Sequence, residues 1–313
     1  MRGHSGTIGS QINVGGTQVL VNNGTISADV AGGAITILES AVTNNGTLSA
    51  LNGGTLVLSS NVSGGATGQI VAGAGSTVLQ NGITISGTIN TSGGGQFRAT
   101  GNANNFLNGV TFNGDLDMAS AFGLERVTAG GLVLNGTINV ANASVLSFEG
   151  NGGLSGNANI VLAAVGGSNN RIFFDGNGTT TFGAGTTVRG HSGTIGSQIN
   201  VGGTQVLVNN GTISADVAGG TITIFESAVT NNGTLSALNG GTLVLSSNVG
   251  AAPRPDRGRR RQHRAAKQHH HQRHHQHQRQ RSVRATGDAG NFLERRVTFN
   301  GDLDMASALG SNA

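Results

Sequence analysis

The stretch QVLVNNGTISADV, at residues 18–30, contains the pattern from which the fold of this chain can be predicted. Aliphatic residues precede an Asn-Asn-Gly triplet, and apolar and polar residues alternate through TISADV (25–30) after it. An alternation with a period of two, together with many β-branched residues, is typical of β-strands. Asn and Gly tolerate the positive φ that a tight turn requires. The stretch therefore predicts two short strands joined by a tight turn.

The same turn signals recur at a spacing that suits a solenoid. Asn-Asn-Gly-Thr begins at Asn22 and again at Asn44, 22 residues later, and Asn-Gly-Thr returns at Asn135 and Asn177. A coil of this length cannot bury its apolar face alone, but stacked coils share a core and let Asn, Ser and Thr form ladders. We therefore predict an all-β, single-stranded, right-handed parallel β-helix with strands of about three to six residues. Antiparallel hairpins are the alternative, because Asn-Gly is also a strong hairpin signal.

A long internal duplication runs through the chain. Residues 2–62 recur at 189–249 with a constant offset of 187, and only two positions differ: Ala34 becomes Thr221 and Leu38 becomes Phe225. Met1 occupies the position of Val188, as expected if an internal valine codon served as a start. We interpret the chain as a fragment of a longer repetitive protein.

The second copy ends in an Arg/His/Gln-rich run that reads as a frameshifted repeat. If residues 83–92 are given plausible codons and read one base out of frame, the product is HHHQRHHQHQ, which is the sequence of 269–278. We expect 1–249 to form the solenoid, 250–283 to be a disordered basic insertion, and 284–313 to be a partial, truncated return of the repeat. Pro253 and Pro255 cannot join an interior ladder.

Composition excludes several classes of protein. The chain has 55 Gly in 313 residues without a three-residue period, which excludes collagen, and it has no Cys, Trp or Tyr. Residues 250–296 carry a charge of +10 and the remainder −6, which gives the net +4. A nucleic-acid signature is therefore confined to one segment. No apolar stretch approaches the ~20 residues of a membrane helix.

The repeated strings of this chain resemble those of a known group of proteins. Strings such as Val-Asn-Asn-Gly-Thr-Ile (21–26) and Gly-Gly-Thr-Leu-Val-Leu (53–58) look like the β-strand repeats of bacterial autotransporter passengers and adhesin-like exoproteins. The resemblance covers most of 1–249 and returns in 297–309. It implies a secreted or surface-displayed β-solenoid stalk, often adhesive. The carboxy-terminal membrane barrel of autotransporters is missing from this sequence.

The basic run offers the first candidate site. Its histidines could chelate Zn, Ni or Cu, and its cations could bind nucleic acid or anionic lipid. The candidate metal ligands are His269, His270, His271, His274, His275 and His277. The candidate cations, within a module at 257–281, are Arg257, Arg259, Arg260, Arg261, Arg264 and Lys267. The frameshift interpretation makes both roles incidental.

Carboxylates supply two further candidates. Asp115-Leu116-Asp117 and its copy at 302–304 place two carboxylates on one strand face, and with Arg126 they could line a polysaccharide-cleaving cleft. Asp175-Gly176-Asn177-Gly178-Thr179 begins like a calcium loop but lacks the bidentate Glu that would complete it. We interpret the first set as a solvated strand face and the second as a polar turn.

Two smaller patterns complete the search. His4-Ser5 and His191-Ser192 pair a nucleophile with a base, but adjacent strand residues point to opposite faces and do not easily form the needed hydrogen bond, so we interpret both pairs as turn residues. A Thr array that could bind ice is not sustained around Thr36 or Thr223. Phe173, Phe174 and Phe182 are expected to stack within a coil or to plug it.

These observations predict a structural and adhesive stalk of an exported bacterial protein, without catalytic residues, metal or cofactor. Its partner would be a host or matrix glycan or protein, with no specific nucleic acid. Its location would be the extracellular or outer-membrane surface of a Gram-negative-like bacterium. The alternatives are a β-helix polysaccharide-active enzyme and a cationic metal- or nucleic-acid-binding module at 257–281.

Overall fold

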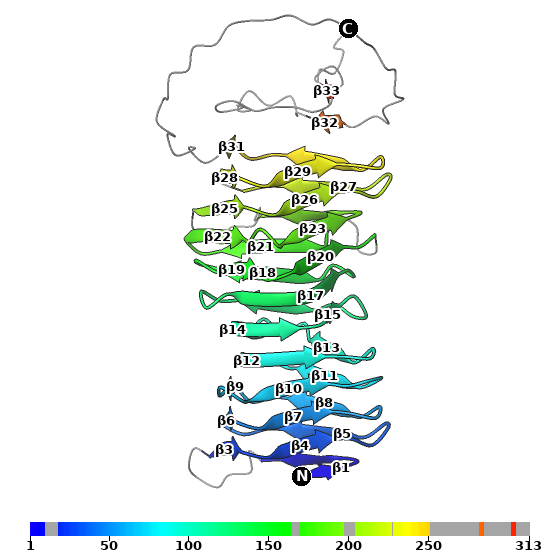
Figure 1. The fold of residues 1–313 in the computed structure, drawn as a ribbon, viewed down its shortest axis with the longest axis vertical. Helices are drawn as coiled ribbons and strands as arrows, with labels where there is room; N and C mark the ends of the chain where they lie inside the picture. Colours follow the sequence, from blue (N-terminus) through cyan, green and yellow to red (C-terminus); the bar gives the residue numbers. More distant parts are fainter. Residues whose placement is uncertain are drawn as a thin grey trace, which may run out of the picture.

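Parallel strands stacked into a β-solenoid of about ten turns make up the structure, a computed structural model (Figure 1). It describes residues 1–9, 18–164, 169–196, 204–226 and 228–250, together with the strand backbones at 282–284 and 302–304. Every strand pairing in these residues is parallel, and none of them lies in an α-helix. The predicted parallel β-helix is therefore confirmed, and the hairpin alternative is wrong.

Each coil contributes one strand to each of three stacks, and three long strands turn a corner and serve two stacks. The long strands are β12 (Thr84–Thr91), β14 (Phe106–Asn113) and β17 (Leu132–Val140). The prediction of strands of three to six residues was wrong for these three, because in them the chain passes from one sheet to the next without a turn.

Stack 1 also holds β1 (Arg2–Gly3), β4 (Thr25–Ala28), β7 (Thr47–Ala50), β10 (Gln69–Ala72), β19 (Gly153–Ser155), β22 (Gly178–Phe182), β25 (Gln205–Asn209), β28 (Ala228–Asn231) and β31 (Val249–Gly250). Stack 2 also holds β2 (Gly6–Ile8), β5 (Ala34–Ile37), β8 (Thr55–Leu58), β11 (Thr77–Gln80), β13 (Gln96–Ala99), β15 (Leu116–Met118), β20 (Ala158–Leu162), β23 (Thr187–Gly190), β26 (Thr212–Ala215) and β29 (Thr234–Ala237). Stack 3 also holds β3 (Val19–Asn22), β6 (Ala41–Asn44), β9 (Val62–Gly64), β16 (Leu124–Val127), β18 (Val145–Glu149), β21 (Arg171–Asp175), β24 (Gly193–Ile195), β27 (Thr221–Ile224), β30 (Thr242–Leu245), β32 (Ser282–Arg284) and β33 (Asp302–Asp304).

The core is a column of inward side chains that follows from the alternating pattern. In stack 2, Ile35, Leu56 and Val78 lie in register on successive coils, and each is at most 4% exposed. Their neighbours in sequence point outward. Because each coil covers the apolar face of the previous one, burial is continuous along the rod.

Phenylalanine rings fill the middle of this core. Phe148, Phe174 and Phe182 form a cluster with ring centroids 5.6–6.1 Å apart. Phe174 and Phe182 therefore lie together inside the coil as predicted, but they meet edge to face, with 68° between the ring planes, rather than stacked. Phe173 does not lie inside: it alternates with Phe174, lies on the outer surface, and has the Arg171 guanidinium 5.5 Å from its ring centroid.

Asparagine ladders join the coils at the strand ends. The Asn22 amide donates to Asn44 Oδ1 at 2.8 Å, and in the second copy Asn209 donates to Asn231 Oδ1 at the same distance. A third ladder runs from Asn135 through Asn113 to Asn90, at 2.9 and 3.0 Å. The predicted Asn ladders are confirmed. Asn22, Asn44 and Asn209 are buried, so their ladders satisfy polar groups that the stacking removes from water, whereas Asn135 is exposed.

The two copies of the duplicated segment form the same strands in different stacks. β3 belongs to stack 3, whereas β25, its copy, belongs to stack 1. β24 lies eight coils above β3 in stack 3, and β25 is the next strand along the chain. The copies are therefore offset by eight coils and one further sheet, so the same sequence fits more than one sheet of the solenoid.

Candidate functional site

The largest cluster of charged side chains in the described residues surrounds Arg126, halfway along the rod. Alternation in β16 directs Arg126 outward, where its guanidinium forms ion pairs with Glu149 on β18 and with Asp175 on β21, the latter at 3.1 Å. It also lies 5.0 Å from the centroid of the Phe106 ring on β14. Two carboxylates therefore offset the charge of Arg126, and the guanidinium covers one face of the ring.

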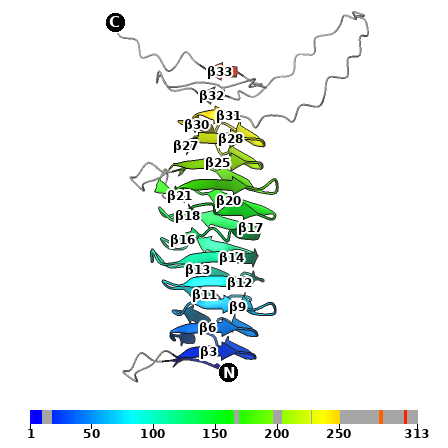
Figure 2. The same ribbon diagram turned by 90° about the vertical axis from the view of Figure 1, so that its left-hand side faces the viewer.

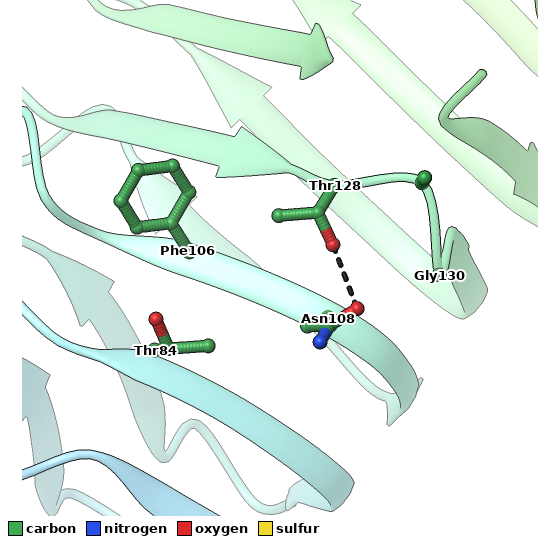
Figure 3. A pocket seen from close by; sticks show the side chains of 6 residues that line it. Thr84, Phe106, Asn108, Thr128 and Gly130 are labelled. Carbon is green, nitrogen blue, oxygen red and sulfur yellow. Dashed lines mark hydrogen bonds between the residues drawn. The ribbon is translucent and has the colours of Figure 1, made fainter. Parts of the chain in front are cut away.

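An open depression lies beside this cluster (Figure 3). Its volume is about 460 Å³, and it is lined by Thr84, Phe106, Asn108, Thr128, Ala129 and Gly130. Thr128 Oγ1 donates to Asn108 Oδ1 at 2.8 Å across one side. Parallel register brings Thr84, Phe106 and Arg126 onto successive coils of stack 3. A phenyl edge with hydroxyl and amide groups can contact a small neutral ligand, but it presents no charged group for acid–base chemistry.

The polysaccharide-cleaving cleft considered as an alternative for Asp115, Asp117 and Arg126 is not assembled. Asp115 and Asp117 do flank buried Leu116 on one outer face, as expected, but they lie in or next to stack 2, while Arg126 lies in stack 3. Asp115 accepts a hydrogen bond from the Thr137 amide at 2.8 Å. Arg126 pairs with other carboxylates. The two aspartates therefore organise coil contacts on a different sheet from Arg126.

Asp117 itself holds a turn. Its carboxylate accepts hydrogen bonds from the backbone of Ala119 and Ser120 and from the Ser120 hydroxyl, and it lies 3.6 Å from the Arg98 guanidinium. Although burial raises the pKa of Asp117, the hydrogen bonds and the arginine outweigh it, so the pKa is lowered from its ordinary value. An acid with a lowered pKa is ionised at neutral pH and does not serve as a general acid there.

The two His-Ser pairs each form a hydrogen bond. His4 Nδ1 and Ser5 Oγ lie 2.8 Å apart, and His191 Nδ1 and Ser192 Oγ lie 2.6 Å apart, so the bond that strand geometry disfavours forms in both copies. The residues lie in turns before β2 and β24, as interpreted, and the strand geometry that disfavours the bond therefore does not apply to them. Ser5 Oγ also accepts a bond from the Ala34 amide on the next coil, at 3.3 Å. The pair thus joins a turn to the coil above it.

The loop that resembles a calcium site is a polar turn between β21 and β22, as interpreted. Asp175 pairs with Arg126, and Asn177 Oδ1 accepts a hydrogen bond from the Thr204 amide at 2.7 Å. Gly176 has a φ of 78°, which the turn requires.

The remaining candidates cannot be placed. The histidines at 269–277, the cations at 257–267 and the whole module at 257–281 lie outside the described residues, and of 302–304 only the strand backbone is described. Within the described ranges, no group of three or more His, Cys, Asp or Glu side chains could hold a metal ion, and no helix is long and apolar enough to cross a membrane.

One buried group was missed by the sequence analysis. Glu125 is fully buried in the core, and its Oε2 has no hydrogen-bond partner, nor does Oε1 of neighbouring Gln80. Burial raises the pKa of Glu125 well above its ordinary value of 4.5, while the Arg126 amide and the Gln80 side chain lower it by smaller amounts. The sequence LERV (124–127) has one apolar residue at each end. Its pattern therefore did not indicate whether Leu124 and Arg126 or Glu125 and Val127 point into the core.

We expect Glu125→Gln to stabilise the chain at neutral pH. Because the folded pKa is above the unfolded one, the folded state binds the proton more tightly, so stability is full below about pH 4.5 and falls as pH rises towards the raised pKa. The neutral amide removes this loss and offers Gln80 a donor. Urea unfolding of both proteins between pH 4 and pH 8 measures the difference, which should grow with pH. A difference that stays constant over this range would contradict the prediction.

No protein-family model, curated protein or solved structure matches this chain. The geometry of its own residues therefore carries the functional argument.

Proposed function

We propose that this chain is a structural and adhesive stalk, the passenger fragment of an exported bacterial surface protein. The observation that supports this is the unbroken parallel stacking from β1 to β31, which makes a rod rather than a globule (Figures 1 and 2). Ten turns at ~4.8 Å each give a length of roughly 50 Å.

The contacts between successive coils suit a protein that withstands mechanical tension. Backbone hydrogen bonds between successive coils run along the rod, so the bonds that define the sheets also resist its extension. Asn ladders such as Asn22–Asn44 and Asn209–Asn231 add side-chain bonds in the same direction. Each coil contacts only its neighbours, which lets such a rod lengthen by adding coils.

The polar side chains of the described residues mostly serve the rod itself. Ion pairs join Arg98 to Asp117, Arg126 to Glu149 and Asp175, and Arg189 to Asp216, each between different strands or turns. Groups held in this way stabilise the stack, and this favours display and adhesion over catalysis.

Surface display of the full chain tests this proposal. The chain would be fused to a heterologous outer-membrane anchor in a non-adherent bacterium, with the anchor alone and the anchor carrying a globular protein of similar mass as controls. We expect rods in electron micrographs and adherence to host cells or matrix above both controls. Globular particles, or adherence no greater than that of the controls, would refute the proposal.

A further inference from the structure

The duplicated segments each present the same outward patch. In the first copy it consists of Val19, Val21, Ala41 and Thr43, and in the second of Val206, Val208, Ala228 and Thr230. Just past the duplication, Ser63 extends the first set and Gly250 the second. These residues alternate with inward ones such as Val42 and Val229, each at most 2% exposed. We call the two sets the first and second repeat patch.

The repeat patches lie in different stacks but on the same side of the rod. β3, β6 and β9 occupy stack 3, and β25, β28 and β31 occupy stack 1. All six are on the left of Figure 1, and when that side is turned to the viewer in Figure 2, strands of both sets face forward.

The winding of the stacks explains this coincidence. Stack 1 passes from the front of the rod at β4 and β7 to its left side at β25 and β28 (Figure 1). Sheets wind in this way because each strand is twisted relative to the next. Over eight coils the winding carries stack 1 to the side where stack 3 began. The offset of one sheet between the copies is thereby cancelled, and the repeat patches face one direction about 40 Å apart along the rod.

The repeat patches carry no charged side chains. The six strands contain no Asp, Glu, Lys, Arg or His. Their outward side chains carry methyl groups of Val and Ala, with hydroxyls at Thr43 and Ser63 in the first patch and at Thr230 in the second. Beside each patch runs an exposed amide ladder, Asn45 to Asn23 and Asn232 to Asn210, both at 2.9 Å. Such a surface suits a neutral partner with apolar faces and hydroxyl groups, since binding it desolvates no charge.

We propose that the two repeat patches form one bivalent face that binds a linear, neutral polysaccharide, each patch contacting a separate stretch of the same polymer. This proposal rests on the adhesive function proposed above and specifies its ligand class. Patches without large aromatic side chains bind weakly one at a time, and linking two of them raises the overall affinity by roughly 10²–10⁴. Their alignment is what allows one straight polymer to engage both.

The test measures binding of the full chain to immobilised dextran, amylose and a β-1,4-glucan by surface plasmon resonance. Thr43→Lys and Thr230→Lys each place a charge in one repeat patch. The matched controls are Thr36→Lys and Thr223→Lys, which change the same kind of outward residue at another duplicated position, on β5 and β27. Far-ultraviolet circular dichroism confirms that all four variants keep the β-structure.

We expect either patch variant to weaken binding to at least one polymer by roughly 10- to 100-fold, because one lost patch abolishes bivalency. The control variants should stay within about twofold of the parent. Oligosaccharides shorter than about 40 Å should bind as weakly as the polymer binds a single-patch variant.

Three results would overturn the bivalent face: no binding to any of the three polymers, patch variants within twofold of the parent, or controls as weak as the patch variants.

A second experiment locates the two patches directly. Since the chain has no Cys, biotin can be attached at Thr43→Cys and Thr230→Cys and imaged with bound streptavidin. Streptavidin on opposite sides of the rod in micrographs would equally exclude the bivalent face. The display assay above reports adhesion to cells independently, so a stalk that adheres through another surface is distinguished from a chain that does not adhere.

Discussion

Phe174→Ala is expected to destabilise the middle of the rod by about 3–5 kcal/mol, the usual cost of removing a buried phenyl ring. Phe174 is 1% exposed and packs against Phe148 and Phe182, at centroid distances of 6.1 and 5.9 Å. The cavity would lie between the coil of β18 and the next coil, which holds β21 and β22, and a close-packed solenoid core has no other layer to fill it. Urea unfolding monitored by circular dichroism measures the loss, and hydrogen exchange in β18, β21 and β22 shows where it acts.

Phe173→Ala is the matched control, because it changes the same residue type one position earlier on the same strand. Phe173 points outward, and its described ring contact is with Arg171 at 5.5 Å. We expect this variant to lose about 1 kcal/mol or less. Equal losses for the two variants would show that the alternation of β21 is not as described.

Gly211→Ala is expected to cost about 1–3 kcal/mol, whereas Gly24→Ala should change stability by less than about 0.5 kcal/mol. The two glycines are the same residue of the duplicated segment. A Cβ at Gly211 would lie 2.1 Å from the Thr186 carbonyl oxygen of the coil below, while a Cβ at Gly24 meets no described atom within 4 Å. Backbone cannot move aside as a flexible side chain can, so the second copy must shift.

Thermal unfolding of both alanine variants and the parent makes this comparison. The local sequence around the two sites is identical, so intrinsic propensity cancels between them. If both variants are destabilised alike, the cost comes from the turn itself and not from the coil beneath it.

The amino-acid sequence by itself determined the local features of this protein. Alternation placed Ile35, Leu56 and Val78 in a core, and the Asn-Asn-Gly spacing of 22 residues set the length of the coil. These features depend on φ, ψ and side-chain direction over a few residues, so they can be read from a short window. The duplication was equally plain in the sequence.

The candidate site was only partly visible in the sequence. Arg126 stood out as a rare cation, but its partner Asp175 is 49 residues away, and coil register decides that contact. Glu125 gave no signal, since LERV does not alternate. The His-Ser hydrogen bonds depend on turn geometry, which the sequence pattern left undetermined.

Only the tertiary structure decided how deeply each residue of the duplicated segment is buried, and in which sheet it lies, in each of the two copies. Leu207 is fully buried between β22 and β28, whereas Leu20, the same residue of the first copy, is only partly buried at the end of the described stack. The placement of β3 and β25 in different stacks, and their return to one side of the rod, are likewise tertiary. The lengths of the corners between sheets and the twist between neighbouring strands add up over eight coils. A short stretch of sequence therefore does not reveal where the second copy is placed.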